Sequence, residues 1–137
     1  MIEGPLRILI AEDDTRLAEL VEDVLDHDGR FLIVGRAKDG DEAIELCEAH
    51  DPDIVLMDIG MPGRNGIDAT RAIHARDAKQ HVVIYTGSDE YDDVARADAA
   101  GAVGFLHKDA LTSPDLAEAL HVLHLNYVSR VPDPESF

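Results

Sequence analysis

Five polar residues stand at or just beyond the ends of short, largely apolar runs of the sequence: Glu12, Asp13, Asp58, Thr86 and Lys108. Runs of this length that lack alternation of polar and apolar positions are typical of buried strands in a parallel sheet. The carboxyl ends of such strands form the edge at which open α/β sheets bind ligands. We therefore expect these side chains to share one site.

The three acids of this set, Glu12, Asp13 and Asp58, would repel one another and raise each other's pKa if they converged without a cation. A bound divalent ion would relieve this repulsion. A site with only oxygen ligands favours Mg²⁺, with Mn²⁺ as an alternative, over Zn²⁺. Lys108 would add an ammonium group, and Thr86 would add a hydroxyl that can donate to an arriving oxygen. This combination predicts a site for a phosphoryl group.

Asp58 is the most central acid of the predicted site, because it ends the apolar run 54–57 and opens the loop 58–66. A carboxylate in that position can attack phosphorus and carry the phosphoryl group as an acyl phosphate, while a metal ion neutralises charge on the transferred oxygens. The loop has the pattern Asp-x-x-Met-Pro-x-x-x-Gly. Such a loop together with the other four residues is hard to obtain by chance, so we interpret Asp58 as a nucleophile.

The elements that must position these residues follow from hydrophobic periodicity. Apolar runs that could form strands recur near residues 6–11, 31–35, 53–57, 82–85 and 102–106. Between them, apolar residues repeat at intervals of three and four, as in amphipathic helices. This alternation predicts an α/β fold with a doubly wound, five-stranded parallel sheet. We expect the flavodoxin-like strand order 2-1-3-4-5, which places the first and third strands side by side and brings the three acids into one crevice.

Two helix starts are marked by local signals. Asp39 followed by Glu42 resembles a capping box, and Ser113 before Pro114 should begin the last helix. The core stripe expected for that helix is Leu116, Leu120, Leu123 and Tyr127.

Four other residues of the last helix lie outside this stripe. Val122 and Leu125 extend its apolar surface and suggest a partner or dimer face. His121 and His124 are three residues apart and away from the predicted acidic site, so we interpret them as surface or partner-facing residues, with metal binding as the alternative.

Length, net charge and cysteine content limit the classes to which the protein can belong. A chain of 137 residues fits one domain, with residues 1–128 as the domain and 129–137 as a tail or the start of a linker. The formal net charge of −17 opposes direct binding to nucleic acid or to anionic membranes. Cys47, the single cysteine, is interpreted as an inert core residue. The absence of a signal pattern or a long apolar run predicts a cytoplasmic protein.

On the residues named above, the chain resembles a response-regulator receiver domain of two-component signalling, from about Leu6 to about Tyr127. The resemblance implies that Asp58 is phosphorylated by a histidine kinase or phosphotransfer protein. It also implies that Glu12, Asp13, Asp58 and the backbone carbonyl of Gly60 hold Mg²⁺, and that Lys108 and Thr86 contact the phosphoryl oxygens.

The resemblance further implies a switch in which Thr86 moves towards the phosphoryl group and Phe105 rotates inward. The face formed by the helix after Thr86, the following strand and the last helix would then change, and it is a candidate homodimer surface. Asp109 follows Lys108 where many members have proline, as in receivers joined to helix-turn-helix output domains.

Three other functions are possible for a chain with these elements. An aspartyl phosphatase usually has a second acid two residues after the nucleophile, and Gly60 occupies that position. A dinucleotide-binding domain would need a glycine-rich turn after the first strand, where this chain has Glu12 and Asp13. A receiver-like interaction module that works without phosphorylation stays open as the alternative.

Overall fold

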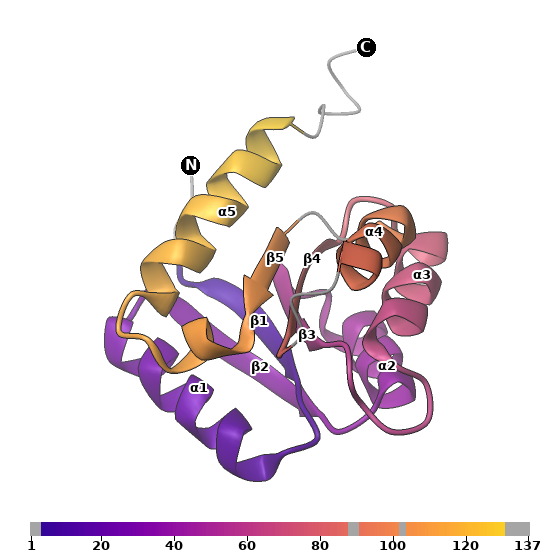
Figure 1. Ribbon diagram of the computed structural model, residues 1–137. Helices are drawn as coiled ribbons and strands as arrows, with labels where there is room; N and C mark the ends of the chain where they lie inside the picture. Colours follow the sequence, from indigo (N-terminus) through magenta and orange to yellow (C-terminus); the bar gives the residue numbers. More distant parts are fainter. Residues whose placement is uncertain (1–3, 88–90, 102–103, 131–137) are drawn as a thin grey trace.

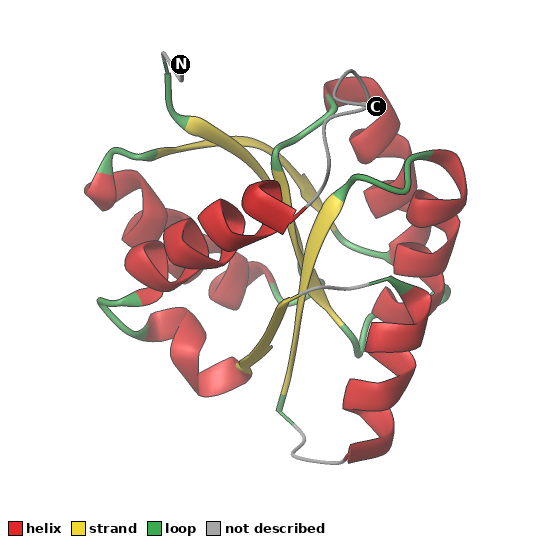
Figure 2. Cartoon of the chain, turned by 90° about the horizontal axis from the view of Figure 1, so that it is seen from above, coloured by secondary structure: helices red, strands yellow, loops and turns green. Residues whose placement is uncertain are grey.

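The computed structural model describes residues 4–87, 91–101 and 104–130. It shows a five-stranded sheet with helices on both faces (Figures 1 and 2). The strands are β1 (Leu6–Ala11), β2 (Phe31–Ala37), β3 (Ile54–Asp58), β4 (His81–Thr86) and β5 (Gly104–His107). The helices are α1 (Thr15–Asp28), α2 (Gly40–His50), α3 (Gly66–Arg76), α4 (Tyr91–Ala100), a short 3-10 helix (Lys108–Thr112) and α5 (Leu116–Arg130).

Every pair of neighbouring strands is parallel, and the order is β2-β1-β3-β4-β5. The predicted fold class and strand order are therefore confirmed. The first and third strands are neighbours, with Ala11 of β1 paired with Met57 of β3. The residues that follow these two strands must consequently leave the sheet at the same edge.

The sheet separates two layers of core, because successive side chains of each strand point to opposite faces. Leu9 and Ala11 of β1 belong to the layer covered by α2, α3 and α4. Ile8 and Ile10 belong to the layer covered by α1 and α5. Figure 1 shows the same division, with α1 and α5 on one side of the sheet and α2, α3 and α4 on the other. Burial on both faces explains why the central strands β1, β3 and β4 are largely apolar without alternation.

Cap residues define the helix starts near the site. Asp14 caps α1, and its Oδ1 accepts hydrogen bonds from the N–H groups of Arg16 and Leu17. Asp39 caps α2, and its Oδ1 accepts from the N–H of Glu42 at 2.8 Å, as the sequence predicted. In a complete capping box the carboxylate of Glu42 would accept from the N–H of Asp39. It accepts instead from the N–H of Lys38, one residue earlier.

Helix α5 begins at Leu116, three residues after the predicted start at Ser113. Ser113 instead forms a turn: its Oγ accepts from the N–H of Asp115, and its carbonyl accepts from the N–H of Leu116. The serine therefore closes the turn before the helix and does not cap the helix itself. The predicted stripe of α5 is confirmed at Leu116 and Leu120, which are fully buried.

The structure corrects the interpretation of His124 as a surface residue. His124 is only 8% exposed, and its Nδ1 lies 2.9 Å from Nδ1 of His81 on β4. The ring of His81 also stacks on that of Tyr127, with centroids 4.3 Å apart. His124 was misjudged because its burial depends on how α5 crosses the sheet, which a helical repeat does not show.

Other features agree with the sequence. Cys47 is a buried free cysteine, and Val122 and Leu125 are exposed, as is Val128. No helix in the described ranges is both long enough and apolar enough to cross a membrane. Of the predicted tail, residues 131–137 lie outside the described part of the chain, as do residues 102–103 of the fifth apolar run.

Candidate functional site

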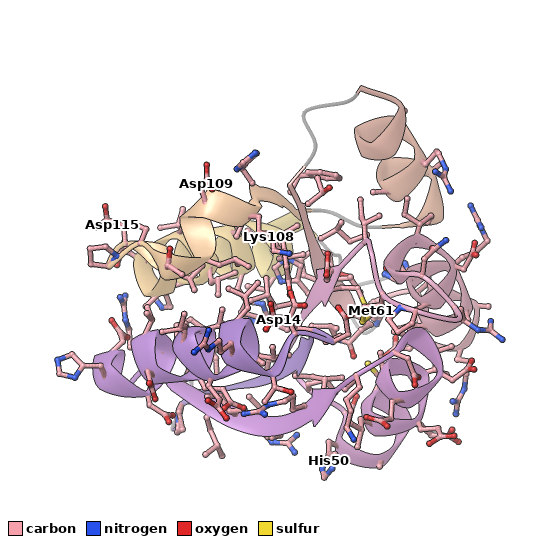
Figure 3. The ribbon with its side chains drawn as sticks, turned by 60° about the horizontal axis from the view of Figure 1, so that its bottom comes forward. Asp14, His50, Met61, Lys108, Asp109 and Asp115 are labelled. Carbon is pink, nitrogen blue, oxygen red and sulfur yellow. The ribbon has the colours of Figure 1, made fainter. Side chains whose placement is uncertain are left out.

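The carboxylates of Glu12, Asp13 and Asp58 meet at the carboxyl edge of the sheet. One oxygen from each residue lies within 4.8 Å of one from each of the others. Figure 3 looks onto this edge and labels Asp14, which precedes α1, and Lys108, which follows β5. The structure therefore places in one cluster the three acids for which the predicted strand order implied a shared crevice.

Glu12 is held at both of its carboxylate oxygens. Oε2 accepts the N–H of Asp14 at 2.9 Å, and Oε1 accepts the hydroxyl of Tyr85 at 2.7 Å. The residue is only 1% exposed, whereas Asp13 is exposed. Burial raises the pKa of Glu12, and the two hydrogen bonds oppose that rise.

Asp58 is the last residue of β3 and is 6% exposed. Its Oδ1 accepts the N–H of Gly60 at 3.1 Å. Burial raises the pKa of Asp58, the negative charge of Asp13 adds to the rise, and the Gly60 N–H and the Lys108 ammonium oppose it. The carboxylate thus lies nearly buried at the edge of the sheet, where its ionisation costs free energy unless a cation compensates the charge.

The loop after Asp58 is fixed by close backbone contacts. The N–H of Ile59 donates to the carbonyl of Tyr85, and the N–H of Gly66 donates back to the carbonyl of Ile59. The N–H of Gly40 donates to the carbonyl of Arg64 at 3.0 Å, and a Cβ at position 40 would lie 2.1 Å from that oxygen. The glycines of this region therefore allow α2 and α3 to approach the loop.

Lys108 follows β5 and lies beside the residue after β4. A Cβ on Gly87 would be 3.9 Å from Cδ of Lys108. Burial raises the pKa of both Glu12 and Asp58, and the ammonium charge of Lys108 opposes that rise in each, so Lys108 belongs to the same site. Thr86 ends β4, is buried, and pairs in register with His107.

Phe105 is the residue that the resemblance assigns as the switch aromatic. It is partly buried on β5 and packs against the core layer of α2, α3 and α4. It pairs in register with Ile84, two residues before Thr86. The strand that carries Phe105 is therefore paired directly with the strand that ends at Thr86.

The donor set fits a hard divalent cation. The cluster contains three carboxylates and no nitrogen or sulfur ligand among the described residues. One lysine is not enough to balance three carboxylate charges in a partly buried site. Oxygen ligands, few in number and open to solvent on the Asp13 side, are the kind of site in which Mg²⁺ keeps several of its waters.

Sequence reasoning missed Tyr85, whose hydroxyl donates to the Glu12 carboxylate of the acidic cluster. Tyr85 was treated as one apolar residue of the run 82–85. The available signal was its type: a tyrosine in a strand buried on both faces must find a partner for its O–H. That its partner is Glu12 could be identified only from the three-dimensional structure of the sheet.

Comparison with known proteins agrees with this geometry. The family model for the response regulator receiver domain matches residues 8–121. The chain is 42% identical over 118 residues to the transcriptional regulatory protein PdtaR of Mycobacterium tuberculosis, an alignment that covers 86% of this chain and 56% of PdtaR. It thus spans about half the length of that relative.

Two further similarities cover almost the whole of the protein compared. The chemotaxis protein CheY of Halobacterium salinarum is 33% identical over 114 residues, which are 83% of this chain and 92% of CheY. The solved signal receiver domain of NarL from Mycobacterium tuberculosis has a TM-score of 0.84 at 31% identity, covering 90% of this chain and 98% of that domain. Domains of this kind act as signalling switches and not as turnover enzymes. The chain therefore belongs to the response regulator receiver domain family of two-component signalling.

Proposed function

We propose that this chain accepts a phosphoryl group on Asp58 and uses the modification as a signal. The donor would be a histidine kinase, a phosphotransfer protein or a small phosphodonor. One observation carries the proposal. Asp58 ends a buried strand, one of its carboxylate oxygens lies within 4.8 Å of an oxygen of each of two further carboxylates, and the positive charge of Lys108 acts on it. An acid that only caps or solvates a loop would not be expected beside two further carboxylates and a lysine.

In the transfer step, an oxygen of the Asp58 carboxylate attacks phosphorus and forms a new P–O bond. The bond from phosphorus to the donor nitrogen or oxygen breaks, and the leaving group takes the electron pair. The buried Asp58 must be ionised to attack, and the Gly60 N–H and the Lys108 ammonium both favour its ionised form. The product is an acyl phosphate on Asp58.

Glu12, Asp13, Asp58 and the carbonyl of Gly60 would hold Mg²⁺, or Mn²⁺ as an alternative. The ion would neutralise charge on the transferred phosphoryl oxygens. Lys108 would pair with one of those oxygens, and the Thr86 hydroxyl would donate to another. These contacts exist only with the phosphoryl group in place, so they favour whichever conformation of the Thr86 segment makes them.

The output face is proposed to consist of α4, β5 and α5, with Thr86 and Phe105 as the switch residues. Phe105 lies on β5 and has no hydroxyl, so it would report the change through packing alone. This face would bind a partner or form a homodimer. With a net charge of −17, direct binding of this segment to nucleic acid or to an anionic membrane is not expected.

The proposal is tested by treating the protein with acetyl phosphate, with and without Mg²⁺, and measuring intact mass. One added phosphoryl group should appear with Mg²⁺ and disappear in Asp58→Asn. Asp26→Asn, which changes an exposed acid of α1, is the matched control and should be modified normally. If the native chain gains no phosphoryl group and also fails to bind beryllofluoride, a receiver-like interaction module that works without phosphorylation replaces the proposal.

A further inference from the structure

We propose that Tyr85 is a positioning residue for the cation site, because its hydroxyl sets the orientation of the Glu12 carboxylate. This inference rests on the proposed function of the acidic cluster. It adds a residue that would not coordinate the ion and would not touch the phosphoryl group. Tyr85 acts instead through the hydrogen bond to Oε1 of Glu12, which is 2.7 Å long.

The hydrogen-bond pattern leaves the Glu12 carboxylate little freedom. Oε1 accepts the Tyr85 hydroxyl, while Oε2 accepts the backbone N–H of Asp14. The same hydroxyl lies 3.4 Å from the carbonyl oxygen of Ala11, the residue before Glu12. Two donors on opposite oxygens prevent rotation of the carboxylate plane, so the lone pairs that remain face a defined direction.

Tyr85 can hold Glu12 because its own ring is fixed. The side chain is 0% exposed and belongs to the core layer of α1 and α5, where Leu111 and Leu116 also lie. A buried phenol needs a hydrogen-bond partner, and a buried carboxylate needs a donor, so each group satisfies the other. Loss of either leaves the other without that partner.

The same residue also contacts the strand end that carries Asp58. Tyr85 pairs in register with Asp58, and its carbonyl accepts the N–H of Ile59 at 3.2 Å. Its hydroxyl therefore fixes one carboxylate of the cluster while its backbone fixes the peptide that follows another. Tyr85 thus links the two strand ends, β1 and β3, that supply the acids.

Outer groups that orient metal ligands affect affinity strongly, and their loss typically weakens metal binding about 10- to 100-fold. Tyr85→Phe removes the hydroxyl and keeps the buried ring. We expect this variant to bind Mg²⁺ about 10-fold more weakly, measured by NMR titration of the backbone amides of residues 12–14. Tyr127→Phe is the matched control, because Tyr127 also donates its hydroxyl to a backbone carbonyl, that of Lys79, away from the acids.

A double-mutant cycle separates positioning from a general loss of stability. Glu12→Gln should weaken Mg²⁺ binding by itself. If Tyr85 acts through Glu12, adding Tyr85→Phe to Glu12→Gln should cost no further affinity. Full additivity of the two losses would overturn the inference, as would a dissociation constant for Tyr85→Phe within twofold of the wild-type value.

The wild-type protein gives a second readout that needs no variant. The chain has three tyrosines, so labelling the ring carbon that bears the hydroxyl gives a small, assignable set of NMR signals. Addition of Mg²⁺ should shift the signal of Tyr85 and leave that of Tyr127 in place. An unmoved Tyr85 signal in protein that binds Mg²⁺ contradicts the positioning role, whereas protein that binds no Mg²⁺ contradicts the proposed cation site itself.

Discussion

The Cα of Gly66 lies against the carbonyl group of Asp58, so that a Cβ at position 66 would be only 2.1 Å from the Asp58 oxygen. The nearest atoms are all backbone and include Cα of Ile59 at 3.0 Å. A side chain at position 66 would therefore displace the backbone of Asp58 and Ile59. The glycine that ends the loop motif is required by close packing at the start of α3.

Gly66→Ala is accordingly expected to destabilise the fold, although alanine is the better helix former. Forcing an extra methyl group into packed surroundings costs about 1–3 kcal/mol, and rigid backbone neighbours favour the upper end of this range. Urea denaturation measures the change. Gly4→Ala is the control, because a Cβ there meets nothing within 4 Å, and an equal effect of both substitutions would contradict the packing explanation.

The buried pair His81 and His124 predicts a loss of stability in mild acid. Burial, reinforced by the neighbouring histidine, lowers the pKa of His81 to about 3, and burial also lowers the pKa of His124. Both values lie below the value of about 6.5 expected in the unfolded chain. The free energy of unfolding should therefore be at its full value above about pH 6.5 and should fall as the pH drops from there towards 3.

The slope approaches about 1.4 kcal/mol per pH unit for each histidine that must gain a proton on unfolding. Urea melts at several pH values between about 7.5 and 4.5 would show it. His81→Phe keeps an aromatic ring against Tyr127 and removes one titrating group, so its pH dependence should be flatter than that of the wild type. His27→Gln changes an exposed histidine and should follow the wild-type curve.

Lys108 is expected to limit the burial-driven rise in the pKa of Glu12 and Asp58. Its charge opposes the effect of burial on both Asp58 and Glu12, so Lys108→Gln should raise the pKa of each carboxyl group. Carbon-13 NMR of the side-chain carboxyl groups, recorded without divalent ions, measures both values. Lys79→Gln removes an exposed lysine and serves as the control. Unchanged pKa values in Lys108→Gln would place the ammonium outside the site.

The strands and the polar residues at their ends could be predicted from sequence because both depend on local signals. A strand buried on both faces must be apolar throughout, and the first polar residue after it marks the edge of the sheet, as at Asp58 and Glu12. The strand order confirmed here then brings β1 and β3 together. No information beyond topology was needed to unite their carboxylates.

Contacts between distant elements could not be predicted in this way. The Tyr85 hydroxyl reaches Glu12 across the sheet, and the pairing of His81 with His124 depends on where α5 crosses β4. Hydrophobic periodicity shows which face of a helix or strand is buried, but it does not show which residue of another element that face contacts. The start of α5 was misplaced for a different reason: a serine before a proline can close a turn as well as cap a helix, and Ser113 closes the turn.

The most direct test of the central claim is chemical identification of the phosphorylated residue. Protein treated with acetyl phosphate and Mg²⁺ is reduced with borohydride, which converts an aspartyl phosphate to homoserine, and its peptides are then sequenced by mass spectrometry. Homoserine should be found at position 58 and only after phosphodonor treatment. Homoserine at Asp13 or any other acid, with Asp58 intact, would contradict the assignment of Asp58 as the acceptor.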